Sequence, residues 1–193
     1  MKKIAIVAAL LPLTACINFG SEPPSALMTL SPALNLEAGE TVDSGDARAV
    51  TIRTPEVPQE LATVRVPVQA TDTSIAYVKD AQWVEQPASM FARLLGDTIA
   101  ARTGRVIIGE RQAIGRPGAN LSGALRAFGI DARANEARVV YDASLMREGS
   151  TTFERRRFTA SVPVTAIERD AVGSALNQAA NQVASDVADW IGE

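Results

Sequence analysis

The sequence contains no histidine and a single cysteine, Cys16, among its 193 residues. Without histidine, the chain has no Ser-His-Asp or Cys-His catalytic set and no histidine-ligated zinc or haem site. A lone cysteine also has no partner for an internal disulfide. We therefore expect no metal site and no cofactor, while chemistry that uses only carboxylates stays open.

Three further features are scarce or missing. Aromatic residues make up 5% of the chain against 47% for all hydrophobic residues, so small and branched aliphatic side chains must supply most of the core. The formal charge is −3 at pH 7, whereas a nucleic-acid-binding protein shows a concentrated basic face. Beyond the N-terminal segment, no apolar run approaches the roughly 18 residues of a transmembrane helix. We therefore expect neither a nucleic-acid partner nor a membrane-spanning helix.

The N-terminus has the parts of a signal peptide. Lys2 and Lys3 form a short positive region, and the apolar run over 4–13 is too short to cross a bilayer as a helix. Residues 13–16 read Leu-Thr-Ala-Cys, the pattern of a bacterial lipobox. This pattern predicts cleavage by signal peptidase II and lipidation of the cysteine thiol.

Cleavage between Ala15 and Cys16 divides the chain into three parts. Residues 1–15 are the predicted lipoprotein signal peptide, residues 16–26 the lipidated N-terminus and its polar, turn-prone tether, and residues 27–193 one domain. Acyl chains such as palmitate on Cys16 are expected to anchor the domain to a membrane. The alternative is an ordinary signal peptide followed by an incidental cysteine.

The hydrophobic periodicity predicts an α+β fold with a mostly antiparallel sheet and two amphipathic helices packed on one face. Apolar spacing of three and four residues predicts helices over 87–104 and 170–191, with Pro87 in the first turn and Asp170 as an N-cap. We expect an irregularity in the longest strand near 128–129. Alternation predicts strands over 27–30, 47–54, 64–69, 75–79 and 105–108, and an antiparallel meander over 121–132, 139–145 and 153–164.

Four residues are candidates for contact with a partner or a lipid. Trp83 is one, although packing on the sheet at the start of a helix also explains it. Arg155, Arg156 and Arg157 are three consecutive arginines in an acidic chain. In a strand, the first and third point to one face and the second to the other. They are suited to lipid phosphates or an acidic partner, and a solvated strand beside acidic neighbours is the alternative.

Four carboxylates near the predicted meander turns are the remaining candidates for catalysis. Carboxylates are common in such turns for solubility, and we therefore expect no enzymatic activity. These residues are Asp131, Glu136, Asp142 and Glu148.

The order of several segments resembles a known family. Residues 27–32 read Leu-Met-Thr-Leu-Ser-Pro and are similar to a "Y-x-L-x-P" opening, with Met28 in place of the usual aromatic residue. Residues 83–87 read Trp-Val-Glu-Gln-Pro and resemble "W-x-E-P-L" with one residue inserted. Together with 128–131, 155–158 and 175–179, they resemble the auxiliary lipoproteins of ABC-type transport systems, such as paraquat-inducible protein C and the lipoproteins associated with MCE-domain lipid transporters.

The resemblance implies transport of lipids or other hydrophobic compounds across the cell envelope. The implied partners are a periplasmic MCE-domain protein and its ABC permease and ATPase. The implied location is the periplasmic side of the outer membrane, which agrees with Ile17, rather than Asp, after the cysteine. This chain lacks the motif G-x-x-x-x-G-K-[ST], so ATP hydrolysis belongs to another subunit.

Two alternatives of a different kind stay open. The chain is either a pilot or assembly lipoprotein for another envelope complex, or a domain that carries lipid itself in a groove under its helices. Phe91, Leu94, Leu95 and Ile99 would line such a groove, unless they form a plain core face.

Overall fold

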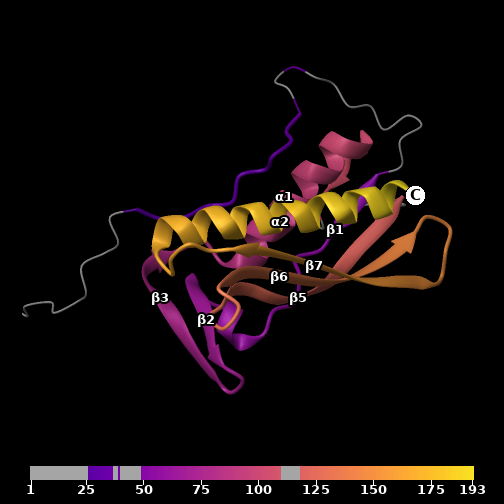
Figure 1. Ribbon diagram of the computed structural model, residues 1–193. Coiled ribbons are helices and arrows are strands. Elements are labelled where there is room, and N and C mark those ends of the chain that lie inside the picture. Colours follow the sequence, from indigo (N-terminus) through magenta and orange to yellow (C-terminus); the bar gives the residue numbers. More distant parts are fainter. Residues whose placement is uncertain (1–25, 37–38, 40–48, 110–117) are drawn as a thin grey trace, which may run out of the picture.

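The computed structural model describes residues 26–36, 39, 49–109 and 118–193 (Figure 1). Ala15, Cys16 and the predicted signal peptide lie outside the described residues. In the described part, seven strands form one sheet, and two long helices cover one of its faces. The strands are β1 (Val50–Ile52), β2 (Arg65–Thr71), β3 (Ser74–Gln82), β4 (Ile107–Ile108), β5 (Ala119–Asp131), β6 (Glu136–Arg147) and β7 (Phe153–Pro163), and the helices are α1 (Pro87–Thr103), α2 (Arg169–Gly192) and the 3-10 turn η1 (Gln59–Leu61).

The three longest strands form the predicted antiparallel meander. β5 pairs with β6 from Ala119 opposite Arg147 to Asp131 opposite Glu136, and β6 pairs along its length with β7. The turn between β5 and β6 places Asn135 in the left-handed region, at φ 52°. Asparagine tolerates this region better than most residues. The expected turn at Asn135 and the α+β fold class are both confirmed.

The sheet is mixed, which corrects the expectation of a mostly antiparallel one. β1 and β2 lie parallel to the two ends of β5, and β4 lies parallel to β1. The segment between β1 and β2 follows the middle of β5, since the amide of Glu56 donates to Gly123 and the amide of Leu125 donates to Glu56, at 2.9 and 2.8 Å. The chain from 50 to 71 is thus one interrupted strand beside β5. Alternation shows which face a side chain takes, but not the direction of the neighbouring strand.

Two local expectations need correction. The irregularity in β5 lies at Arg126, where the register with β6 shifts between Leu125 and Ala127, and not at 128–129. Such a bulge inserts one residue, so alternation resumes with Phe128 facing the core. The segment 27–30 is not a full strand, because it makes only one bridge, between Met28 and Trp83.

Both helices begin and end close to the predicted residues. Pro87 stands in the first turn of α1, and Gly104 ends it in the left-handed conformation, with φ 64°. The N-cap of α2 is Glu168, two residues before the expected Asp170, and Asp170 lies in the first turn of the helix. There its carboxylate interacts favourably with the positive end of the helix dipole.

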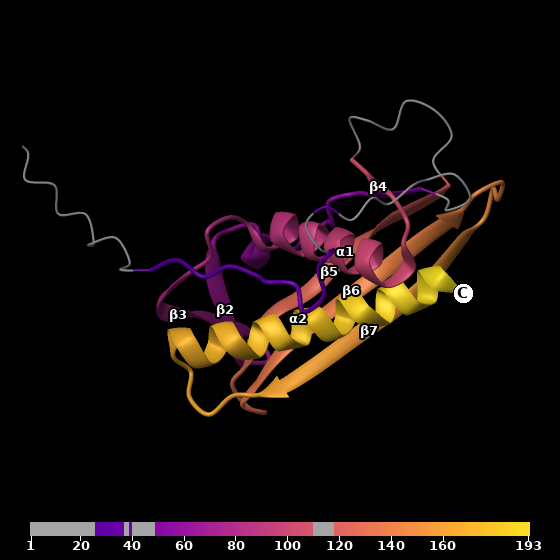
Figure 2. The same ribbon diagram turned by 90° about the horizontal axis from the view of Figure 1, so that it is seen from above.

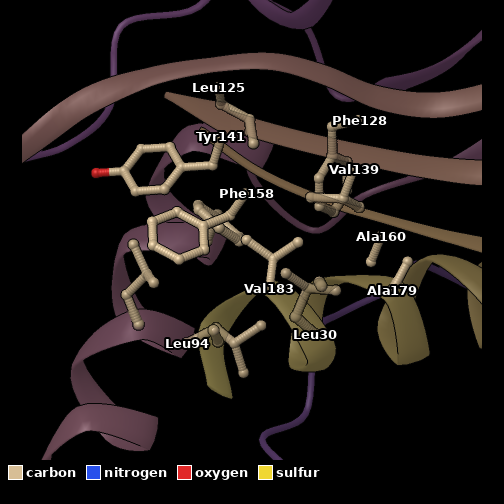
Figure 3. Close-up of a cluster of buried hydrophobic side chains, with 14 of the residues drawn as sticks. Leu30, Leu94, Leu125, Phe128, Val139, Tyr141, Phe158, Ala160, Ala179 and Val183 are labelled. Atoms are coloured by element: carbon tan, nitrogen blue, oxygen red, sulfur yellow. The ribbon is translucent and has the colours of Figure 1, made fainter. Parts of the chain in front are cut away.

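The core lies between the helices and the sheet (Figures 2 and 3). Its aromatic residues are in contact with one another: the rings of Phe91 and Tyr141 are 5.3 Å apart, and those of Trp83 and Phe128 are 5.5 Å apart. Between α2 and β7, small residues such as Ala179 and Ala160 lie side by side (Figure 3) and allow close approach of the helix to the sheet. Leu94 and Val183 fill the space under the helices. A plain core face is therefore favoured over a lipid groove at this place.

The first described segment, 26–36, runs along α2. The amide of Ser31 donates to Asn177 Oδ1 at 2.8 Å, and the amide of Ala33 donates to Asn181 Oδ1 at 2.7 Å. Asn181 Nδ2 donates in turn to the carbonyl of Ser31 at 3.0 Å. We call 26–36 the strap, because these bonds hold it on the helix and bury Leu30 in the core.

Candidate functional site

The face of the sheet opposite the helices carries a polar surface that the meander builds. Tyr141, Ala143 and Leu145 of β6 face the helices, so the alternate residues Asp142, Ser144 and Met146 face the other way. Cross-strand pairing sets Ser122 of β5 and Arg155 of β7 on either side of Ser144. One row of polar side chains thus crosses three strands.

This surface is hollowed into an open cleft of ≈ 930 Å³. Its floor is low because Ser122 and Ser144 are short, whereas longer side chains stand at its borders. One border is the segment after β1, with Arg53 and Thr54, and the other is β7. The lining residues are Arg53, Thr54, Glu56, Asn120, Ser122, Gly123, Ala124, Arg126, Asp142, Ala143, Ser144, Met146, Phe153, Arg155, Arg156 and Arg157.

Asp142 lies between two arginines in the cleft, one row beyond Ser144 from the Phe153 end. Arg157 donates to both of its carboxylate oxygens, at 2.5 and 2.8 Å, and Arg126 donates from Nε at 3.0 Å. The hydrogen bond from Arg157, and then the one from Arg126, lower the pKa of Asp142 to about 2. Asp142 is therefore ionised at neutral pH and holds both guanidinium groups over the sheet.

The three consecutive arginines take the predicted alternate directions. Arg155 and Arg157 face the cleft, where Arg155 Nε donates to Ser144 Oγ at 3.3 Å. Among the described residues, no carboxylate lies within ion-pair distance of Arg155. The Arg156 guanidinium lies over the Phe158 ring, 5.3 Å from its centroid, and 4.0 Å from Glu193. The structure thus brings Arg155 and Arg157 together with Arg126 of β5 and with Arg53 from the segment after β1.

The cleft has an excess of positive charge in an acidic chain. Four arginine side chains face it, Arg53, Arg126, Arg155 and Arg157, against the two carboxylates of Glu56 and Asp142, whereas the whole chain has a formal charge of −3. One end is apolar: Met146 pairs with Phe153, which is 61% exposed. The arrangement is suited to a ligand that combines negative groups with an apolar part.

Trp83 is placed in the core rather than on a contact surface. Its exposed fraction is 1%, and its ring packs against Phe128. This burial removes it from the residues that a partner can touch, and it favours the packing interpretation. Trp190, 6% exposed, likewise packs against Phe158 at 5.6 Å.

The four candidate carboxylates are not gathered into one site, since Asp131 and Glu136 pair at the turn between β5 and β6, Asp142 lies within β6 and Glu148 lies in the turn after it. Asp131 accepts hydrogen bonds from the amides of Arg133 and Ala134 at 3.1 and 3.3 Å, which stabilises the turn between β5 and β6. Asp142 is held ionised by its arginines, which does not suit a general acid at neutral pH. In the part of the chain that the structure describes, no cluster of three potential metal ligands occurs.

Arg53, Arg126, Ser122 and Ser144 were missed by the sequence analysis. Ser122 and Ser144 lie in alternate phase to the buried residues of β5 and β6, so the strand pattern places them on the outer face. Arg126 is brought there by the bulge, and Arg53 by the parallel pairing of β1 with β5. Neither the bulge nor the parallel pairing is indicated by a pattern in the neighbouring sequence.

The described helices include none that is long and apolar enough to cross a membrane. Cys16 and its cleavage site stay predictions from the sequence, since they lie outside the described residues.

Similarity to solved structures agrees with the fold. The chain matches protein XCC0632 from Xanthomonas campestris with a TM-score of 0.66 and 18% identity, over 86% of this chain and 91% of that one. It matches an uncharacterized protein with the same score and identity, over 75% and 92%. It also matches the hypothetical protein CT253 from Chlamydia trachomatis with a TM-score of 0.51 and 6% identity, over 75% and 98%. At these identities the likeness shows the fold alone.

The family follows from the sequence match over the domain. No curated protein sequence matches the chain. The family model described as "ABC-type transport auxiliary lipoprotein component" matches residues 29–188, which extend from the strap nearly to the end of α2. This match spans the meander, both helices and the cleft, and the chain therefore belongs to the family of ABC-type transport auxiliary lipoprotein components.

Proposed function

We propose that this protein is the lipid-anchored docking subunit of an MCE-type ABC transport system that moves lipids or other hydrophobic compounds across the cell envelope. The family match over residues 29–188 carries the proposal. In this role the chain is not an enzyme. It positions the transporter at a membrane, and the ATPase subunit supplies the energy.

The proposed anchor and the strap support a positional role. A tether from Cys16 to residue 26 spans at most about 35 Å when fully extended. Beyond it, the strap is attached to α2 through Asn177 and Asn181. The lipid on Cys16 would therefore keep the domain within a few nanometres of the bilayer, on the periplasmic side of the outer membrane.

The packed core supports docking over lipid carriage. Leu94, Leu95 and Ile99 of α1 are at most 2% exposed and belong to one core with the sheet and α2. An acyl chain would have to displace these side chains to enter between helix and sheet. The exposed surface with distinct chemistry is the polar cleft on the opposite face.

Purification of the full-length lipoprotein from native envelopes, after brief chemical crosslinking, tests the proposal. We expect an MCE-domain protein with its permease and ATPase to be recovered. Recovery of secretin or polysaccharide-export subunits without any MCE protein would instead indicate a pilot or assembly role. Lipid extraction of the same sample separates a carrier, which would retain phospholipid in a fixed molar ratio.

A further inference from the structure

The cleft on the helix-free face has a shape that fits an extended chain. From the segment after β1, the strands β5, β6 and β7 follow in order, so the two borders are three strand spacings apart, or about 14 Å. Between them the floor is formed by serine side chains. The hollow is therefore wide enough for one extended polypeptide and shallow enough to leave part of it in contact with solvent.

The spacing of the cationic groups matches the repeat of an extended chain. Arg155 and Arg157 lie two residues apart on one face of β7, as do Phe153 and Arg155. Residues two apart in a strand are about 6.8 Å apart. An extended partner presents its own alternate side chains at the same interval, so two acidic residues and one apolar residue would meet these three side chains.

The carboxylate of Asp142 is an example of the anionic group that the cleft arginines bind. Its carboxylate receives bonds from Arg157 and Arg126, and the bonds from Arg157 are in bidentate geometry. Arg155, beside them, donates to the Ser144 hydroxyl and has no carboxylate partner in the described part of the chain. Two carboxylates from outside the chain would complete the row, one on Arg155 and one on the N–H groups of Arg157 that Asp142 does not use.

The position of the cleft favours a protein over the membrane that anchors the chain. Met28 of the strap lies against Gly173, in the second turn of α2. The cleft end of β7 lies at the other end of this helix, where Arg156 is 4.0 Å from Glu193. These two ends are about 30 Å apart along the helix, and Figure 2 shows the strap beside β3 and the C-terminus at the opposite end. The arginines are thus presented away from the anchored end.

We infer that the cleft between Arg53 and β7 binds an extended acidic segment of a partner polypeptide, with carboxylates on Arg155 and Arg157 and an apolar residue on Phe153. The inference rests on the proposed docking function and names the chemistry of its partner. Charge complementarity of this kind speeds association and sets the register, and salt weakens it.

Peptide binding to the full-length lipoprotein in detergent tests the inference. The probe is a ten-residue peptide that alternates glutamate and threonine and ends in phenylalanine. The uncharged control is the same peptide with glutamine in place of each glutamate. We expect the glutamate peptide alone to bind, and about 0.5 M NaCl to abolish the binding. Arg155→Gln should weaken binding about threefold, and Arg155→Gln with Arg157→Gln about tenfold.

Arg93→Gln with Arg102→Gln is the matched control. It removes the same charge from α1, on the helix side of the molecule, where the two arginines pair with Glu85 and Asp189. We expect unchanged peptide binding in this variant. An equal loss of peptide binding in both double variants would show that only the net charge of the protein matters. That result would overturn the inference.

Three other results would also overturn it. The first is that wild-type protein does not bind the glutamate peptide at millimolar concentration. The second is binding of inorganic phosphate, or of phosphatidylglycerol vesicles but not phosphatidylcholine vesicles, with the same dependence on Arg155 and Arg157. This result would make the cleft a phosphate site. The third is that no anion binds and that the variant Arg155→Gln with Arg157→Gln self-associates. The arginines would then serve only to keep the edge strand β7 from pairing with another chain.

Failure of the inference and failure of the proposed function are distinguishable. The cleft assignment alone would be overturned by two results together. The transporter would be recovered from envelopes equally well with the Arg155 and Arg157 substitutions, and the peptide would not bind. Peptide binding without recovery of any transporter subunit would overturn the proposed function alone.

Discussion

Asp142 organises the arginines of the cleft, and its low pKa makes this contribution dependent on pH. The folded state holds this carboxylate ionised down to about pH 2, whereas an unfolded aspartate titrates near pH 3.9. Protons therefore bind the unfolded state first as the pH falls. The stabilisation is complete above about pH 4 and is lost as the pH falls towards 2.

Asp142→Asn tests this linkage. At pH 7 we expect a loss of about 1 kcal/mol in the free energy of unfolding, because the ion pairs are partly exposed to solvent. The side chain of Asp142 is 28% exposed. Urea denaturation should show the difference between wild type and variant shrinking between about pH 4 and pH 2. A difference that stays constant over this range would contradict the role of ionised Asp142.

Gly129 is required where β2 approaches β5. A Cβ atom at this position would lie 2.4 Å from the carbonyl oxygen of Pro67. Gly129→Ala should therefore cost more than about 2 kcal/mol, because one of the two strands must shift.

Gly173→Ala in α2 is the control for this substitution. A Cβ atom there meets Met28 Sδ at 3.5 Å, an ordinary contact, and alanine favours the helix by about 0.5–1 kcal/mol. Thermal unfolding should show opposite shifts for the two variants. Equal stability of Gly129→Ala and wild type would show that the strands are less tightly paired than described.

At the scale of elements, the strap depends on two side chains one turn apart on α2. Asn181→Ala removes the bonds to Ala33 and Ser31 and should cost about 1–2 kcal/mol. Amide hydrogen exchange over 28–34 should become faster than in wild type, while exchange in β6 changes only with global stability.

Gln182→Ala is the matched control for the strap. Its side chain contacts Asp186 of the same helix, at 2.9 Å, and does not reach the strap. Exchange in the strap should stay at the wild-type rate. Faster strap exchange in this variant would indicate that α2, and not the asparagine pair, determines the protection.

Elements with local signals agree with their predicted positions. α1 and α2 are confirmed within a few residues, because caps and a 3.6-residue period are encoded nearby in the sequence. The strands that pair in parallel, β1, β2 and β4, are where the expected sheet type was wrong. Their parallel partners are separated from them by at least α1 in the chain, and no local pattern specifies which long-range pairing forms.

At the scale of the whole molecule, attachment to a membrane depends on Cys16 in our proposal. Cys16→Ser should leave the domain folded, because the residue lies outside it, and should move the protein from the membrane fraction to the soluble fraction after cell fractionation. A variant that stays acylated and membrane-bound would contradict the lipobox assignment. Circular dichroism equal to that of wild type controls for misfolding.

The sequence by itself determined the order of elements, the core faces of β6 and both helices, and the family, because periodicity, caps and short motifs are local properties. Only the tertiary structure decided the cleft, the burial of Trp83 and the position of the arginines relative to the anchored end. Arg126 lies in β5, Arg155 in β7 and Arg53 directly after β1, and parallel pairing, a bulge and an antiparallel register bring them together. These long-range pairings depend on the packing of the whole sheet against α1 and α2.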